Sequence, residues 1–389
     1  MFEKLLQPEV QQFIASHEGS DIAALALRQN PFPEIPYPFI LDQVSGKSKA
    51  RLKLPLWHDT PGIVYPSRVS MEQASSQATA QYKASLAYGG DLIDLTGGFG
   101  VDDVFFAQHF DQVLHCERDR ALSDLVSHNL KVLGVGNVVC FAGDSSQALA
   151  NRDKWDCIYI DPSRRSESKG KVFLLSDCAP DVTVHLPEYF EKSDRILIKA
   201  SPMMDIAAAA TQLSDIAAVH VVALRHEVRE IIFDLRKGSR SFKIYTVNLE
   251  TSQAPWRFDP EDNPLAPLSA PLRYLYEPNA AVMKSGGFGA LARDLNLCKL
   301  HRHSHLFTAD RPIDFPGRAF VIGRVVPFNN QGQRELSALG KANIAVRNFP
   351  LDVAQARKKL KLADGGDIYC FLTTGPDEQK IALICSKIG

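Results

Sequence analysis

Between residues 90 and 250, short apolar segments alternate with segments of helical periodicity. This alternation predicts βα units, which assemble into a doubly wound α/β domain with a parallel sheet and crossover helices. The predicted strands are 91–95, 112–116, 137–141, 156–160 and 194–199, and the predicted helices are 101–110, 119–133, 145–151, 180–191 and 204–213. Three further strand-like segments follow with turns only, which predicts antiparallel strands at the end of the sheet: 218–224, 229–235 and 242–248.

The rest of the chain departs from this pattern on both sides, and 389 residues are enough for two or three domains. Residues 1–64 combine helical spacing with a proline cluster, which predicts a short N-terminal helical segment. Residues 251–272 are rich in proline and acids without periodicity, as in an exposed linker. Residues 273–389 mix strand-like and helical segments and predict a compact α+β domain. The predicted catalytic domain therefore spans 65–250.

The net charge of -1 conceals two regions of opposite sign. Residues 290–389 contain 15 Lys or Arg and 9 Asp or Glu, a net charge of +6, which leaves -7 for residues 1–289. A near-neutral average alone would argue against a polyanionic partner, but the basic C-terminal region keeps nucleic acid among the candidates.

The composition, with 45% hydrophobic and 23% charged residues, excludes a disordered or coiled-coil protein. Seven cysteines without a CxxC pair argue against a disulfide framework and a thiolate zinc site, so we expect reduced thiols and no metal. The N-terminus lacks the apolar core of a signal peptide, and no run approaches the ~20 apolar residues of a membrane span. We therefore expect a cytoplasmic protein without membrane association.

A glycine-rich turn follows the first predicted strand and leads directly into a helix. It contains Asp94, Thr96, Gly97, Gly98 and Gly100. Glycines let the backbone approach a ligand closely, although such a turn is also a common tight connection between strand and helix.

Acidic residues follow the next three predicted strands. Glu117 comes 17 residues after Gly100, where a carboxylate can bind both hydroxyls of a ribose. Asp144 and Asp161 follow the third and fourth strands, and each could instead cap the next helix. Because open α/β sheets bind ligands at the carboxyl edge, the series predicts a site for an adenosine-containing cofactor.

Residues 65–250 resemble the class I S-adenosylmethionine-dependent methyltransferase superfamily. The resemblance implies a Rossmann-like, seven-stranded mixed sheet with terminal antiparallel strands and S-adenosylmethionine as cofactor. It also implies that Asp94 and the glycine turn cradle the methionyl part, that Glu117 binds ribose and that Asp144 meets adenine. The turn departs from the commonest family pattern, since Thr96 stands where the first glycine is usual.

The segment Asp161-Pro162-Ser163-Arg164 resembles the family's Asp-Pro-Pro-aromatic motif, which faces the transferred methyl group. Ser163 replaces the second proline, which leaves turnover open, and no aromatic residue is available here to stack a base. No cysteine nucleophile is near, so we expect an aligned N or O acceptor. Arg164 and Arg165 could grip a phosphate or lie flat on a base, or form ion pairs with acids of the same edge.

Upstream, Ser70 to Gln73 fits a capping box that would open a helix over 71–87. In RNA methyltransferases that the turn resembles, a helix in this place folds over the cofactor. This resemblance makes Gln73, Ser76 and Thr79 candidate cofactor contacts, with ordinary solvent-facing helix positions as the alternative.

The whole chain is similar to bacterial class I methyltransferases that end in a THUMP-like domain, on the segments 274–288 and 367–374. THUMP domains are associated with RNA, so the resemblance implies a tRNA or rRNA substrate. Arg357, Lys358, Lys359 and Lys361 would contact phosphates from a helix, or form an ordinary solvated face. The rival functions are a small-molecule or protein methyltransferase and a non-catalytic RNA-binding protein.

The alternation His301, His303 and His305 predicts three imidazoles on one face of a strand. Such a face could bind a metal, but without nearby thiolates a polar or RNA-facing strand is favoured.

Overall fold

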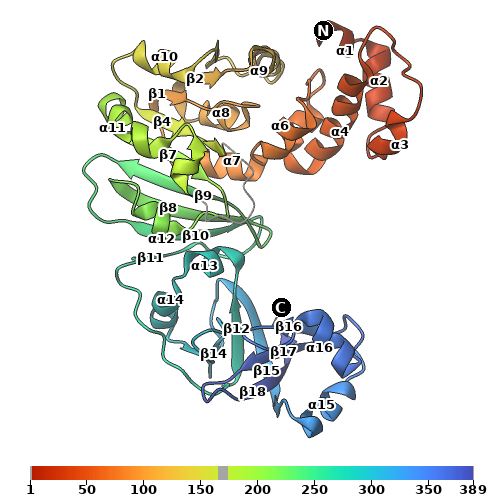
Figure 1. Ribbon diagram of the computed structural model, residues 1–389, viewed down its shortest axis with the longest axis vertical. Coiled ribbons are helices and arrows are strands. Elements are labelled where there is room, and N and C mark those ends of the chain that lie inside the picture. The colour runs from red at the N-terminus through yellow and green to blue at the C-terminus, as the bar shows by residue number, and fades with distance from the viewer. Residues whose placement is uncertain (1, 165–173, 389) are drawn as a thin grey trace. The chain divides into compact units, whose positions relative to one another are not determined.

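The structure is a computed structural model of the chain and describes residues 2–164 and 174–388 (Figure 1). The chain divides into two compact units. The first contains the residues up to Ala217 together with Arg229–Ser241, and the second contains Ala218–Val228 and the residues from Phe242 onward. None of the described helices is long and apolar enough to cross a membrane.

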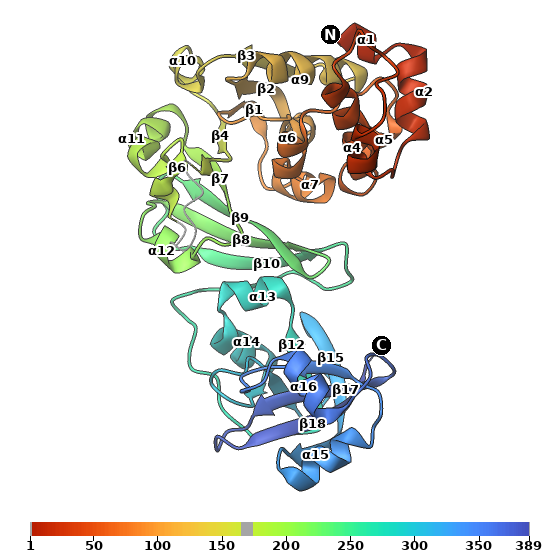
Figure 2. The same ribbon diagram turned by 45° about the vertical axis from the view of Figure 1, so that its right-hand side comes forward.

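The first unit begins with helices, as predicted, and Figure 2 shows them gathered at the N-terminal end of the unit. They are α1 (Phe2–Leu5), α2 (Pro8–Ser16), α3 (Ile22–Ala26), α4 (Tyr37–Lys53) and α5 (Pro55–Asp59). The longest, α4, contacts α2, α3 and α5. Its side chains Ile40 and Val44 are fully buried, and burial of such apolar side chains stabilises the packing of α4.

The single helix predicted over 71–87 is wrong, because the chain forms two short helices, α6 (Arg68–Gln73) and α7 (Gln77–Ala84). Ser67, and not Ser70, caps α6, by accepting a hydrogen bond from the Ser70 N–H. Ala74 is extended, and the Ser76 side chain then caps α7 by accepting from the Thr79 N–H. Two side-chain caps so close together end one helix and start another.

The sheet of the first unit has the order β9-β7-β4-β1-β2-β3. Its strands are β1 (Gly89–Asp94), β2 (Phe110–Glu117), β3 (Val138–Ala142), β4 (Cys157–Ile160), β7 (Arg195–Ala200) and β9 (Glu227–Arg236). Five run parallel, and β9 pairs antiparallel with β7. The central strands are buried, for example at Ile158 and Ile196, which explains their continuous apolar sequences.

Crossover helices connect these strands, as the sequence predicts. They are α8 (Val101–Phe106), α9 (Arg120–Val132), α10 (Ser145–Ala150), α11 (Val182–Lys192) and α12 (Ile206–Ala210). Two short strands, β5 (Ser163–Arg164) and β6 (Cys178–Ala179), form an additional small antiparallel ladder before α11, and a short 3-10 helix, Leu175–Asp177, precedes β6.

Three strands continue from the end of the α/β pattern: β8 (Ile216–Leu224), β10 (Lys243–Leu249) and β11 (Trp256–Phe258). The expectation that 242–248 would pair antiparallel is wrong, because β10 pairs with β8 in parallel. The chain reverses direction twice between them, so these two strands run the same way when they become neighbours. Only β11 is antiparallel in this group, and it pairs with β10.

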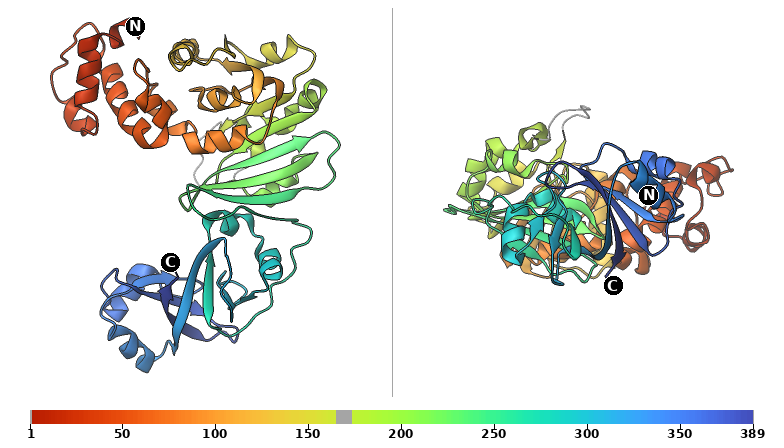
Figure 3. Two further views of the ribbon diagram at one scale, coloured as in Figure 1. Left: turned by 180° about the vertical axis from the view of Figure 1, so that it is seen from behind. Right: turned by 90° about the horizontal axis from the view of Figure 1, so that it is seen from below.

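The C-terminal part of the second unit is an α+β fold around a seven-stranded sheet with the order β13-β14-β12-β15-β18-β17-β16. Its strands are β12 (Tyr274–Pro278), β13 (Cys298–Lys299), β14 (Phe307–Ala309), β15 (Gly317–Pro327), β16 (Asn343–Val346), β17 (Ile368–Thr374) and β18 (Lys380–Lys387). Its helices are α13 (Ala280–Ser285), α14 (Phe288–Leu295), α15 (Asn330–Ser337) and α16 (Val353–Leu360). Figure 3 shows the long strands β15 and β18 from behind.

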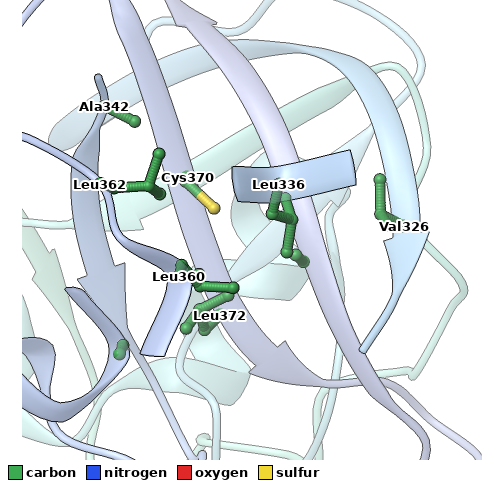
Figure 4. Packing of buried hydrophobic residues seen from close by; sticks show 9 residues of the cluster. Val326, Leu336, Ala342, Leu360, Leu362, Cys370 and Leu372 are labelled. Atoms are coloured by element: carbon green, nitrogen blue, oxygen red, sulfur yellow. The ribbon is translucent and has the colours of Figure 1, made fainter. Parts of the chain in front are cut away.

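Helices α15 and α16 pack on this sheet through a continuous apolar cluster. Leu336 of α15 and Leu360 of α16 are fully buried against Cys370 and Leu372 of β17 (Figure 4). This cluster gives the terminal segment a core of its own, as the alternating pattern of residues 273–389 predicts.

The predicted histidine strand is wrong, because residues 300–306 form turns between β13 and β14. His301 is buried, with Nε2 2.8 Å from Glu378 Oε1 and Nδ1 2.8 Å from Asn348 Nδ2. His305 stacks on Phe288 with a centroid separation of 4.0 Å. Within the described residues no group of three or more His, Cys, Asp or Glu side chains could hold a metal ion.

Candidate active site

A pocket of about 1240 Å³ lies in the first unit at the carboxyl ends of β1, β2, β4 and β7. This is the edge where open α/β sheets bind their ligands. Its wall includes the turn after β1, Glu117, the segment Asp161–Ser163 and the residues from Lys199 to Pro202.

The glycine turn lies directly against β2. The Gly97 N–H donates to the Cys116 carbonyl at 2.9 Å, and a Cβ on Gly97 would lie 2.2 Å from the His115 ring. Gly98 and Gly100 have φ values of +56° and +71°, in the left-handed region that glycine tolerates best. Close contact at one position and backbone geometry at two others therefore explain why glycines stand here.

The imidazole beneath the turn is fully buried. His115 Nδ1 lies 2.6 Å from Asp103 Oδ2, and the ring occupies the space that Gly97 leaves open. Neither residue was predicted as part of the site. The signal that was available is Asp102-Asp103 directly after the turn, in the first turn of α8.

Asp94 is buried and holds the start of the turn. Its Oδ1 accepts hydrogen bonds from the Thr96 N–H at 2.7 Å and from the Thr96 hydroxyl at 3.1 Å. Burial raises the pKa of Asp94 well above its usual range, and the nearby Asp103 carboxylate adds to this rise. The Thr96 hydroxyl also accepts from the Asp161 N–H at 2.7 Å. Thr96 therefore joins the turn after β1 to the segment after β4, which a glycine could not do.

The two acids after β2 and β3 differ in their surroundings. Glu117 lines the pocket, and its carboxylate accepts from the Gly98 N–H at 3.0 Å and from the Asp119 N–H at 2.8 Å. Asp144 caps α10 by accepting from the Ser146 N–H, and it pairs with Arg118 at 3.0 Å. These contacts fit the alternative in which Asp144 caps a helix. The two residues next to it, Gly143 and Ser145, line the pocket instead.

Asp161 forms an ion pair across the pocket wall, with Oδ2 2.5 Å from Lys199 Nζ on β7. Burial would lower the pKa of Lys199, but Asp161, Asp102 and Glu230 outweigh it and raise that pKa. Pro162 and Ser163 line the same wall, and the Ser163 backbone pairs with Ala179.

Two arginines of the predicted motif are described only in part or not at all. The backbone of Arg164 pairs with Cys178 in β6. The Arg164 side chain and the whole of Arg165 lie outside the described residues.

The candidate cofactor contacts upstream of β1 differ in whether they reach the pocket. Gln73 lines the pocket together with Ser70 and Ser75. Thr79 is buried, hydrogen bonds to Ser76 and is not part of the pocket wall.

Beneath the pocket lies a buried ion cluster that sequence reasoning missed. Lys83 Nζ of α7 lies 2.8 Å from both carboxylate oxygens of Glu230 on β9 and 3.2 Å from Asp102 Oδ1 on α8. Asp102 Oδ2 accepts from the Ser75 hydroxyl at 2.9 Å and from the Tyr159 hydroxyl at 2.8 Å. Lys83 and Lys199 hold the pKa of Asp102 below its usual value although burial opposes this.

The basic residues predicted to contact RNA lie on and after α16 in the second unit. Arg357 pairs with Asp364 at 2.7 Å, while Lys358 and Lys359 are exposed. Lys361 is exposed and follows α16 with a φ of +54°. These lysines therefore present charge to solvent at one end of the helix.

Two family models match the C-terminal part of the chain. Residues 274–316 match a ferredoxin-like domain family, and residues 317–387 match a THUMP domain-like family. No curated protein matches the chain.

Among solved structures, the crystal structure of a candidate methyltransferase from Porphyromonas gingivalis W83 is similar over the full length. The identity is 30%, the match covers 100% of this chain and 99% of that chain, and the TM-score is 0.89.

Two further structures are similar only in part. TrmK of M. capricolum, solved with S-adenosyl-homocysteine, is 10% identical over 45% of this chain and 71% of that chain, with a TM-score of 0.32. An rRNA methylase from Streptococcus thermophilus is 15% identical over 41% of this chain and 93% of that chain, with a TM-score of 0.30.

The sheet with its reversed strand, the pocket at its carboxyl edge, the C-terminal family match and the full-length similarity agree with the fold predicted from the sequence. The chain belongs to the class I methyltransferases that carry a C-terminal THUMP-like domain.

Proposed function

We propose that this methyltransferase transfers the methyl group of S-adenosylmethionine to a nitrogen or oxygen atom of RNA. The observation that carries the proposal is the pocket in which the glycine turn, Glu117 and the Asp161–Ser163 segment meet. When bound, S-adenosylmethionine supplies an electrophilic methyl group on a sulfonium.

The residues present fit such a cofactor. Gly97, Gly98 and Gly100 line the pocket without side chains, so the backbone can lie directly against a ligand there. Glu117 offers a carboxylate at the place where a ribose would need an acceptor for its hydroxyls. Gln73 would contribute an amide from α6, whereas Asp144 would act on adenine only after leaving its contacts with α10 and Arg118.

The pocket wall around Asp161 would position the acceptor. Lys199 holds the Asp161 carboxylate, and Thr96 holds its backbone N–H, so the segment is fixed from two sides. Methyl transfer to nitrogen or oxygen depends mainly on alignment of the acceptor with the methyl group. We propose that Asp161, Pro162 and Ser163 supply this alignment, with Arg164 next to them.

An RNA substrate is supported by the second unit. Residues 317–387 match a THUMP domain-like family, and such domains are associated with RNA. The net charge of +6 over residues 290–389 and the exposed Lys358, Lys359 and Lys361 suit contacts with phosphates. We propose tRNA or rRNA as the partner.

The direct test is transfer of a tritiated methyl group to total RNA from a strain that lacks the protein, followed by nucleoside analysis. We expect label in one modified nucleoside. Label in a protein or a metabolite instead of RNA would contradict the RNA substrate.

Calorimetry with S-adenosylmethionine tests the cofactor separately. We expect wild type to bind and Glu117→Ala to bind at least tenfold more weakly, because the carboxylate that would accept from the ribose is gone. Unchanged affinity in this variant would reject the assignment of Glu117.

A further inference from the structure

The wall of the pocket next to Asp161 is completed by α11. Pairing of β5 with β6 places Ser163 opposite Ala179, and the chain then continues through Pro180 and Asp181 into α11. Ala179, Pro180, Asp181 and His185 all line the pocket together with Asp161–Ser163. The register of this short ladder therefore brings His185 to the side of the pocket assigned to the acceptor.

The His185 ring is held in place and remains open to the pocket. Its side chain is 47% exposed, and Nδ1 lies 3.4 Å from Glu188 Oε2, one turn further along α11. The ring stacks on buried Tyr189, with a centroid separation of 5.9 Å and an interplanar angle of 30°. Because Nδ1 is the ring nitrogen next to Glu188, we assign Nε2 to the proton of the acceptor.

The carboxylates of this wall already have partners. Asp161 is paired with Lys199, and Asp181 caps α11 by accepting from the Thr183 N–H at 3.1 Å and from its hydroxyl at 2.7 Å.

Other titratable groups that line the pocket are also unsuited to accept the proton. Asp102 accepts from Ser75 and Tyr159, and Glu117 accepts two backbone N–H groups. Burial raises the pKa of the Cys116 thiol far above its usual value. Histidine is the side chain that ordinarily exchanges a proton near neutral pH, and His185 is the histidine that we find in the described part of the pocket wall.

We propose that His185 is a catalytic residue that accepts the proton released by the methylated atom. This inference rests on the proposed methyl transfer but not on which molecule is the acceptor. The acceptor lone pair forms the new bond to the methyl carbon, the carbon–sulfur bond breaks and its electron pair stays on sulfur. The N–H or O–H proton of the acceptor moves to His185 Nε2, and the half-exposed imidazolium then releases it to solvent.

The test compares His185→Gln with His109→Gln, a matched change at an exposed histidine outside the pocket wall. Single-turnover transfer of the tritiated methyl group to the RNA described above is measured from pH 5.5 to 9. We expect His185→Gln to lower the rate by about 10²- to 10⁴-fold and to remove the fall in rate toward acid pH. His109→Gln should match wild type. The affinity for S-adenosylmethionine, measured by calorimetry, should be the same in all three proteins.

A second variant separates proton transfer from stacking. His185→Phe keeps a ring that could stack on a base but cannot accept a proton, so we expect it to be as slow as His185→Gln. Wild-type rates in His185→Phe, or an unchanged pH profile in His185→Gln, would overturn the proposal. If wild type labels a protein or a metabolite instead of RNA, the RNA substrate is rejected, and the same variants are measured on that acceptor. If wild type labels nothing, methyl transfer and the role of His185 fail together.

Discussion

Thr96 makes two hydrogen bonds that a glycine in its place could not make. Its hydroxyl donates to buried Asp94 and accepts from the Asp161 N–H, so one side chain connects the ends of β1 and β4. The departure from the commonest family turn therefore has a structural purpose in this chain. It fixes the segment that we assign to the acceptor relative to the turn that we assign to the cofactor.

Gly97 should tolerate no side chain. In Gly97→Ala the new Cβ would lie 2.2 Å from the His115 ring, which is fully buried and cannot move aside freely. The turn must shift, so we expect at least tenfold weaker binding of S-adenosylmethionine by calorimetry. Gly136→Ala is the matched control, because nothing lies within 4 Å of its Cβ position. Equal affinity in Gly97→Ala would show that the cofactor does not touch this turn.

Asp94 makes stability depend on pH in a defined direction. Burial raises its pKa in the folded chain, so its contribution is fully present below the unfolded carboxyl pKa of about 3.9 and is lost as pH rises through the folded value. Asp94→Asn keeps an oxygen acceptor for Thr96 and removes the charge.

We therefore expect the melting temperature of Asp94→Asn, relative to wild type, to increase between pH 4 and pH 8. Thermal unfolding at several pH values measures this, with Asp111→Asn at an exposed position as control. A constant difference across this range would contradict the raised pKa.

At the level of elements, the buried cluster of Lys83, Asp102 and Glu230 connects α7, α8 and β9. Lys83 and Glu230 are 147 residues apart in the sequence and fully or nearly fully buried. Lys83→Met would leave two carboxylates buried without their cation, so we expect a loss of about 3–5 kcal/mol in the stability of the first unit.

Chemical denaturation, followed by a probe in the first unit, measures this loss. Lys131→Met at an exposed position is the control and should change stability by less than about 0.5 kcal/mol. Adding Glu230→Gln to Lys83→Met should recover part of the loss, since one of the unpaired charges is then removed. No recovery would mean that packing, and not charge, dominates at this place.

The elements that could be predicted are those set by local pattern. The strands from 91–95 to 242–248 and the helices between them follow from apolar periodicity, and the carboxyl edge follows from parallel topology. The break between α6 and α7 depends on which of several serines caps a helix. The parallel pairing of β10 depends on which edge strand of the sheet is free to pair with it. Local patterning contains neither piece of information.

The same distinction between local pattern and long-range contact separates the site residues that could be predicted from those that could not. Asp94, Glu117 and Asp161 could be predicted because each stands at the carboxyl end of a strand. Lys83 and His185 could not, because a contact across 147 residues places Lys83 in the buried ion cluster and a two-residue ladder brings His185 to the pocket.

For the whole molecule, the uneven charge distribution leads to a prediction about RNA binding. Each phosphate contact releases counterions, and the logarithm of affinity falls with the logarithm of salt concentration by about 0.7 to 0.9 per contact. Replacing Lys358, Lys359 and Lys361 by glutamine removes three exposed charges from the basic region. We expect weaker binding of total tRNA and a salt slope that is smaller by about two to three.

The matched control replaces three exposed lysines of the first unit by glutamine: Lys131, Lys154 and Lys237. Both variants change the net charge equally, so a general effect of charge would alter both slopes alike. Binding is measured by fluorescence anisotropy between 50 and 300 mM salt. Equal slopes in the two variants would place the phosphate contacts elsewhere on the chain, whereas a reduced slope only in the first variant would assign them to the end of α16.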